Sequence, residues 1–120
     1  MSEIKYSPVE LGRDDAYMVD ATIGKNKAGS IYGGYVEKKG YLGHFLVEPD
    51  YRKGYKIGTE LHRGFVEWSR SKGVKEIFVD VKPRKEKDDL ESTIQFLLYM
   101  GWTKVDENNA NDREYKLVIE

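Results

Sequence analysis

A short segment containing glycine and lysine could bind a phosphate group, because it lies between an apolar run and a stretch with helical periodicity. It holds two glycines, Gly54 and Gly58, and three cations, Arg52, Lys53 and Lys56. Glycines let backbone N–H groups turn toward a ligand without a Cβ in the way, and the start of a helix adds a partial positive charge. Together with the cations, these groups predict a pyrophosphate site. The alternative is a tight strand-to-helix turn whose lysines are only solvated.

The elements that must position this segment follow from the apolar pattern. Tyr41 to Val47 is an apolar run typical of a buried strand, and from Ile57 the apolar residues recur with a helical period until Gly73. Lys75 to Val81 then alternates as a strand, which predicts a strand, helix, strand unit with parallel strands. The other expected elements are strands at Ala16 to Ile23, Ser30 to Val36, Trp102 to Val105 and Glu114 to Ile119, and a helix from about Asp88 or Asp89 to Gly101.

This order of elements, β-β-β-α-β-α-β-β, predicts an α/β fold of the mixed α+β kind, with a central mixed sheet flanked by helices. The length of 120 residues and the lack of a linker-like segment predict a single domain over residues 1–120.

The composition restricts the chemistry that this domain could perform. The formal net charge of -1 gives no global attraction to nucleic acid, and the lysine-rich loops leave nucleic-acid binding only as a weaker alternative. There is no cysteine, which excludes thiolate chemistry and disulfides. His44 and His62 lack paired metal-ligand spacing, so no metal is expected. No apolar run has the length of a signal peptide or a membrane span, which predicts a cytoplasmic protein without a membrane partner.

The segment resembles the signature loop of the GNAT superfamily of acetyl-CoA-dependent N-acetyltransferases. That signature is an Arg or Gln, two residues, Gly, one residue, then Gly or Ala, and it follows a strand and a proline. Here the proline is Pro49, and Tyr51 to Thr59 covers the loop. Aligned on Gly58, the first signature position falls on Lys53 and the middle glycine on Lys56. The loop is also one residue longer than is usual in the family. Gly54 is expected to replace the middle glycine of the signature in this longer loop.

The resemblance continues beyond the loop, because Phe96 to Trp102 is similar to the family's helix end and the elements from Tyr41 to Glu120 fit the family order. It implies that coenzyme A lies where the two parallel strands splay apart, with acetyl-CoA as co-substrate, no metal, and the helix after Asp88 beside the acetyl end. Ligands beyond the carboxyl ends of parallel strands are the rule in open α/β sheets. The residues implied to bind coenzyme A are Phe45, Leu46 and Val47 for the pantetheine, and Arg52, Lys53, Gly54, Tyr55, Lys56, Ile57, Gly58 and Thr59 around the pyrophosphate.

The family transfers acetyl by direct attack of an amine on the thioester, which calls for a base and an acid. The family's glutamate base falls on Tyr41, whose ordinary pKa of about 10 makes it unsuitable as a base near neutral pH. The substitutes are His44, whose imidazole ordinarily titrates near neutrality, and Glu48 at the strand end. The family's tyrosine acid falls on Leu97, and Tyr99 is the substitute. Each substitute has a purely structural alternative as a packed or solvated side chain.

The acceptor side of this site is expected to be open. Family members usually carry two helices between their first two strands, and only Gly24 to Gly29 separates the first two strands expected here. An open site favours a macromolecular amine or completion by a second subunit in a homodimer. We therefore expect an N-acetyltransferase acting on a primary amine, either a protein lysine or N-terminus or a small amine. The alternative is a degenerate member that binds coenzyme A, or a protein partner, without turnover.

Overall fold

The computed structural model describes residues 3–52, 54–81, 87–109 and 113–119, without the side chains of residues 87–90. Its described strands form one sheet in the order β1-β2-β3-β4-β5-β7-β6, in which β4 and β5 are parallel and the other neighbours antiparallel. The predicted mixed sheet with helices is therefore confirmed. The elements are β1 (Ile4–Pro8), β2 (Ala16–Ile23), β3 (Asn26–Val36), β4 (Lys39–Val47), the 3₁₀ turn η1 (Pro49–Tyr51), α1 (Ile57–Ser71), β5 (Glu76–Asp80), α2 (Lys87–Tyr99), β6 (Thr103–Lys104) and β7 (Glu114–Val118).

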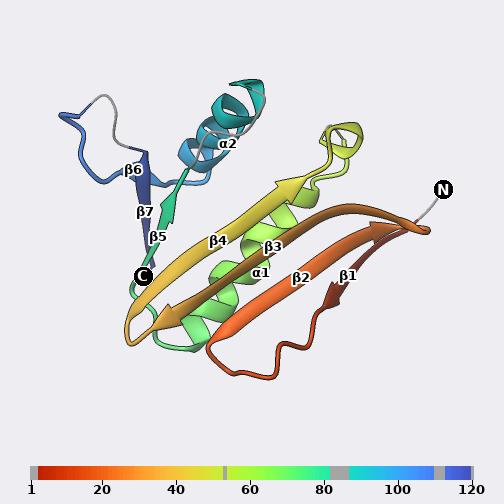
Figure 1. The fold of residues 1–120 in the computed structure, drawn as a ribbon, viewed down its shortest axis with the longest axis horizontal. Helices are drawn as coiled ribbons and strands as arrows, with labels where there is room; N and C mark the ends of the chain where they lie inside the picture. Colours follow the sequence, from red (N-terminus) through yellow and green to blue (C-terminus); the bar gives the residue numbers. More distant parts are fainter. Residues whose placement is uncertain (1–2, 53, 82–86, 110–112, 120) are drawn as a thin grey trace.

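The helices lie on particular parts of this sheet (Figure 1). The helix α1 runs behind β2, β3 and β4, and no helix of the described chain covers the opposite face of these strands. Along α1, the buried residues Ile57, Leu61 and Phe65 recur every fourth position, so one stripe of the helix faces the sheet. The helix α2 lies beyond β5, close to the carboxyl end of β4. We call the uncovered side of β2, β3 and β4 the open face.

Glycines let α1 approach the sheet closely. A Cβ on Gly33 would lie 2.5 Å from both Cζ of Phe65 and the carbonyl oxygen of Tyr41. A Cβ on Gly29 would lie 2.7 Å from the carbonyl oxygen of Leu46. Only residues without a side chain fit at these places, so the glycines of β3 set the distance between helix and sheet.

A β-bulge interrupts β4 beside these glycines. Gly33 pairs with Leu42, whereas the next residue of β3, Tyr32, pairs with His44, so Gly43 is an extra residue on β4. The extra residue shifts the alternation of side chains along the strand. As a result Leu42 is buried under α1 and Phe45 also lies on the α1 side, whereas His44 lies on the open face.

The first strand was not predicted from the sequence. Ile4, Tyr6 and Pro8 alternate with polar residues, which is a weak strand signal, and β1 is stabilised by pairing with β2 along one side only. The expectation of a strand starting at Ser30 was also wrong, because β3 begins at Asn26 after a two-residue turn. The connection between the first two strands is therefore residues 9–15 rather than Gly24 to Gly29, and it contains no helix.

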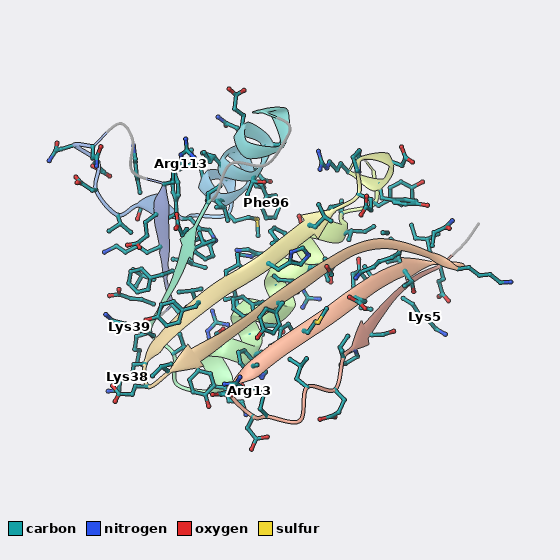
Figure 2. The ribbon with its side chains drawn as sticks, viewed as in Figure 1. Lys5, Arg13, Lys38, Lys39, Phe96 and Arg113 are labelled. Atoms are coloured by element: carbon teal, nitrogen blue, oxygen red, sulfur yellow. The ribbon has the colours of Figure 1, made fainter. Side chains whose placement is uncertain are left out.

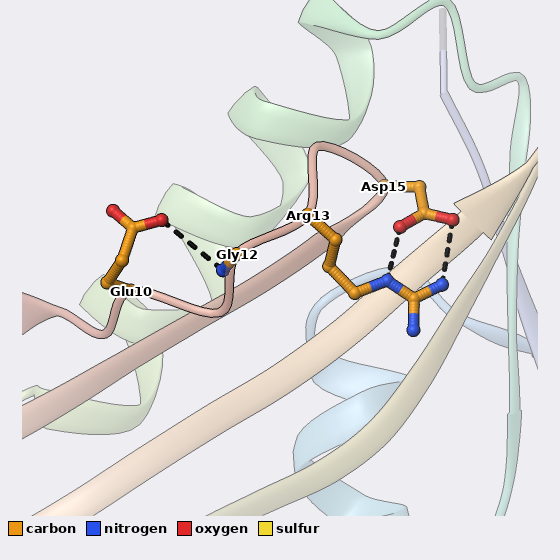
Figure 3. Close-up of polar contacts among 4 residues, drawn as sticks. All are labelled: Glu10, Gly12, Arg13 and Asp15. Atoms are coloured by element: carbon orange, nitrogen blue, oxygen red, sulfur yellow. Dashed lines mark hydrogen bonds and ion pairs between the residues drawn. The ribbon is translucent and has the colours of Figure 1, made fainter.

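Local polar contacts hold this β1–β2 connection (Figure 3). The amide of Gly12 donates a hydrogen bond to Oε1 of Glu10 at 3.3 Å, and Nη2 of Arg13 donates to Oδ2 of Asp15 at 2.8 Å. The hydrogen bond from Arg13 lowers the pKa of the Asp15 carboxyl. The carbonyl of Asp15 in turn accepts a hydrogen bond from the amide of Tyr35 at 3.1 Å. The connection thus crosses from β1 to β2 without a helix, and its Arg13 is close enough to Tyr32 of the open face to interact with it electrostatically.

Candidate functional site

A cleft of about 550 Å³ lies where the carboxyl end of β4 meets the loop before α1 and the side of α2. Its volume is within the range of small-molecule sites. Most of the residues predicted around the phosphate segment line this cleft. Lys53 lies outside the described residues, and Tyr55 packs against Tyr51 with ring centroids 5.4 Å apart. The lining consists of Phe45, Leu46, Val47, Arg52, Gly54, Lys56, Ile57, Gly58, Thr59, Ser92, Thr93, Phe96 and Tyr99.

The cleft exists because β4 and β5 separate. Their parallel pairing covers Lys39 to Tyr41 on β4 and Glu76 to Phe78 on β5, and then stops. Beyond this point β5 continues its ladder with β7 up to Asp80, while β4 runs on to Val47. The later part of β4 is therefore not paired with β5. This confirms the expected splay of the two parallel strands.

The loop before α1 contains two residues in the left-handed backbone region. Gly54 has a φ of 84°, and Lys56, the N-cap of α1, has a φ of 57° and no side-chain capping bond. A lysine in this region is strained, whereas a glycine is not. The uncapped first turn of α1 leaves amide N–H groups directed out of the helix end, which is a favourable place for an anion.

Arg52 does more than supply a positive charge near the predicted phosphate site. Its Nε donates a hydrogen bond to the carbonyl oxygen of Val47 at 2.9 Å. This bond ties the loop to the carboxyl end of β4, while the guanidinium still lines the cleft. Arg52 therefore both shapes the loop and adds positive charge to the site.

One side of the cleft comes from α2, which the sequence reasoning identified only in part. Ser92, Phe96 and Tyr99 are spaced i, i+4 and i+7 and so lie along one helix face, whereas Leu97 is fully buried away from it. Phe96 packs against Phe45 of β4 with ring centroids 5.3 Å apart, and Figure 2 shows it between α2 and the end of β4. The spacing of Ser92, Phe96 and Tyr99 could be read from the sequence, but the sequence did not show that this side of α2 faces the cleft. Tyr99 is 84% exposed at the rim.

A buried histidine of α1 packs against the Phe96 side chain of α2. His62 of α1 is 3% exposed and lies 5.8 Å from the Phe96 ring, centroid to centroid, in an edge-on arrangement. Nε1 of Trp102 donates a hydrogen bond to Nε2 of His62 at 2.8 Å. Burial lowers the pKa of His62 from 6.5 to about 4, so the imidazole is neutral near pH 7. The hydrogen bond ties α1 to the segment that follows α2.

His44, the candidate base, lies on the open face. Its Nε2 is 3.0 Å from Oγ of Ser30, which is itself buried. In the tautomer in which Nε2 donates to Ser30, the lone pair is on Nδ1, and in the other tautomer it is on Nε2. Glu48, the other candidate, lies just beyond β4 and does not line the cleft.

Tyr41, at the family's base position, is half-exposed and pairs with the Phe78 ring at 6.3 Å between centroids. The structure thus separates the candidates for proton transfer. His44 is on the open face of β4, one residue before the part of that strand that lines the cleft, and Tyr99 is on the cleft rim.

The described part of the chain contains neither a metal-binding cluster nor a membrane-spanning helix. No group of three or more His, Asp or Glu side chains is placed to hold a metal ion. No helix there is both long and apolar enough to cross a membrane.

Comparison with known proteins places this geometry in context. The model of the acetyltransferase (GNAT) family matches residues 4–88. No curated protein matches the chain in sequence. An acetyltransferase from Streptococcus agalactiae shares the fold with a TM-score of 0.71 at 21% identity, over 87% of this chain and 67% of that one.

Two further solved structures contain coenzyme A. The PaiA N-acetyltransferase from Thermoplasma acidophilum, in complex with coenzyme A, has a TM-score of 0.70 at 18% identity, over 88% of this chain and 62% of that one. An aminoglycoside 6'-N-acetyltransferase complexed with coenzyme A has a TM-score of 0.67 at 19% identity, over 88% of this chain and 74% of that one. At these sequence identities the three structures show that the fold is shared, and nothing more specific.

Proposed function

Because the chain belongs to the GNAT family of acetyltransferases, we propose that it transfers an acetyl group from acetyl-CoA to a primary amine, either a small amine or a protein lysine or N-terminus. The observation that carries the proposal is the cleft of about 550 Å³, which joins the end of β4 beyond its pairing with β5 to the uncapped start of α1. Acetyl-CoA would enter as co-substrate. The reaction class is that of an acyl-CoA N-acyltransferase.

The residues of the cleft suit two parts of coenzyme A, the pantetheine arm and the pyrophosphate. Phe45, Leu46 and Val47 line the cleft on the part of β4 that extends beyond its pairing with β5, and this strand edge can hydrogen-bond the amides of the pantetheine arm, with the Val47 carbonyl oxygen shared with Arg52. The left-handed loop and the first turn of α1 offer amide N–H groups, and Arg52 and Lys56 add positive charge, which together suit a pyrophosphate. Phe45 and Phe96 provide an apolar wall for the arm.

When bound, acetyl-CoA supplies an acyl thioester with an electrophilic carbonyl carbon. Attack of the amine nitrogen forms the C–N bond, breaks the C–S bond and leaves the electron pair on sulfur. The substrate ammonium must lose one proton to become the attacking amine, and the nitrogen loses a second proton after the C–N bond forms. His44 on the open face would accept a proton directly or through water. Tyr99 at the cleft rim is the group that would donate a proton to the leaving sulfur.

One observation favours the alternative of a degenerate member that binds coenzyme A without turnover. The family's tyrosine position holds Leu97, which is completely buried and has no proton to give. The tyrosine that α2 offers on the cleft is Tyr99, which is 84% exposed at the rim.

Thermal unfolding with and without acetyl-CoA tests the proposal. At about 100 times its Kd, a ligand adds about 2.7 kcal/mol to the free energy of unfolding, which is a rise of several degrees in Tm. Gly58→Asp would place a carboxylate in the cleft beside Phe45, Val47 and Phe96, where it would repel the anionic ligand and abolish the rise. Gly58→Ala is the matched control, because its Cβ would meet neighbours no closer than 3.5 Å.

Turnover then separates the two functions. Release of coenzyme A thiol is measured with monoamines, diamines and lysine peptides. Absence of any Tm rise at millimolar acetyl-CoA would contradict the whole proposal. A Tm rise with acetyl-CoA, together with no thiol release for any amine, would support the alternative of a degenerate member that binds coenzyme A without turnover.

A further inference from the structure

We propose that Asp20 binds a second positive charge on the acceptor, so that the preferred substrate is a primary amine with another cationic group at the far end of a chain long enough to cross from β4 to β2. The proposal rests on the acetyltransferase function above and specifies its acceptor. It is based on a row of residues that crosses the open face from the cleft to β2.

The row is defined by strand register. Asp20 of β2 pairs with Ser30 of β3, and Ser30 pairs with Leu46 of β4. Residues directly opposite each other in a sheet project from the same face. Leu46 lines the cleft, and Ser30 contacts the ring of His44. Neighbouring strands are about 4.8 Å apart, so Asp20 lies about 10 Å across the sheet from the strand that borders the cleft.

The carboxylate of Asp20 is suited to a cation. Its Oδ1 is shielded from solvent and has no hydrogen-bond donor among the described residues. Nζ of Lys27 approaches this oxygen to 3.4 Å, within ion-pair distance but without hydrogen-bond geometry. Both side chains are partly exposed, 28% for Asp20 and 55% for Lys27. An ion pair between two partly exposed side chains that lacks hydrogen-bond geometry is weak. A cationic ligand that donates hydrogen bonds to Asp20 can therefore replace Lys27.

A second row beside the first can hold the chain between the two charges. Met18 pairs with Tyr32, and Tyr32 pairs with His44. Tyr32 is 37% exposed and lies on the open face between β2 and the candidate base. An alkyl spacer or the stem of a lysine side chain can pack on these apolar groups while its ends reach Asp20 and the cleft.

The direct test compares octamethylenediamine, whose two amines can span the row, with octylamine, which has the same chain and one amine. We expect the wild-type protein to acetylate the diamine with a kcat/KM at least tenfold higher. Asp20→Asn should reduce this diamine-to-monoamine ratio about tenfold. Lys27→Gln removes the competing cation and should raise it. Asp14→Asn, an exposed acid in the β1–β2 connection, should leave the ratio unchanged.

Calorimetric binding to the coenzyme A-loaded protein tests the inference without turnover. The wild-type protein should bind the diamine at least tenfold more tightly than octylamine, and Asp20→Asn should remove the difference. Equal binding of the two amines would overturn the inference. If both amines are acetylated equally well, the inference fails while the acetyltransferase function stands, and if neither is acetylated, that function fails and the calorimetry decides the role of Asp20.

A third arm identifies the source of the amine. An extended peptide spans about 3.3–3.6 Å per residue and its side chains alternate in direction, so lysines at positions i and i+2 project from the same side and their long side chains can reach both ends of the row. Preference for this peptide over one with a single lysine, and over the diamine, would assign a protein acceptor with the same chemistry. Absence of any effect of the second lysine would count against the inference.

Discussion

Nε1 of Trp102 donates a hydrogen bond to Nε2 of His62 at 2.8 Å, and both side chains are almost completely buried. Because Nε2 accepts this bond, the proton of the neutral ring is on Nδ1. The pair joins the middle of α1 to the residue that follows Gly101, and Phe96 packs edge-on against the same imidazole. The position of α2 beside the cleft therefore depends on a histidine that has no place in the chemistry.

The first prediction concerns pH and this histidine. Burial lowers the pKa of His62 from 6.5 to about 4, so between these values the unfolded chain binds a proton that the folded chain does not. Stability is therefore unaffected above about pH 6.5 and is lost as the pH falls toward 4, by about 3 kcal/mol in total. Urea unfolding from pH 7 to pH 4 measures the loss. His62→Gln keeps an acceptor for Trp102 but cannot titrate, so its stability should fall less steeply; parallel curves would contradict the assignment.

The second prediction concerns the strained residue of the loop. Lys56→Gly relieves a left-handed φ of 57° and should raise the free energy of unfolding by about 0.5–1 kcal/mol, after allowing for the greater freedom of glycine in the unfolded chain. The same change removes a cation from the cleft and should weaken coenzyme A binding several-fold. Glu37→Gly is the matched control, because Glu37 also has a φ of 57° but lies in the β3–β4 turn. It should add stability and leave coenzyme A affinity unchanged. Loss of stability in Lys56→Gly would argue against strain.

The third prediction concerns close packing beneath the bulge of β4. Gly33→Ala would place a Cβ 2.5 Å from the backbone oxygen of Tyr41 and from the Phe65 ring, neither of which can move freely, so stability should fall by about 2–3 kcal/mol. At Gly64 the nearest atom is the hydroxyl oxygen of Tyr17 at 2.7 Å, at the end of a side chain that can move. Gly64→Ala should therefore be neutral or stabilising in the helix. Equal effects of the two substitutions in chemical denaturation would exclude this explanation.

The fourth prediction concerns proton transfer. His44→Gln keeps a polar partner for Ser30 and should lower kcat about 100-fold, and Tyr99→Phe should lower it about tenfold, because positioned acids and bases contribute about that much. Neither change should alter the Tm rise with acetyl-CoA. Tyr6→Phe removes a hydroxyl from an exposed tyrosine of β1 that does not line the cleft and serves as the control. Full activity in both variants would show that binding and orientation alone perform the reaction.

Much of the fold could be predicted because the signals are local. The stripe of α1, the strand ending at Val47 and the closing glycine at Gly73, with a φ of 83°, are all decided by residues close in sequence. The phosphate segment was equally readable, since its glycines and cations follow one another directly. The first strand escaped prediction because it is short and only its alternation of apolar and polar residues marks it.

The residues of the site that come from different elements could not be predicted in the same way. The sequence alone determined the loop, its place between a strand and a helix, and the resemblance that the family match later bore out. Tertiary structure decided that Phe96 meets Phe45, that Trp102 reaches His62, and that Asp20, Ser30 and Leu46 form one row. The physical reason is that strand register and helix placement depend on packing between distant segments, and a single extra residue such as Gly43 reverses which face a side chain occupies.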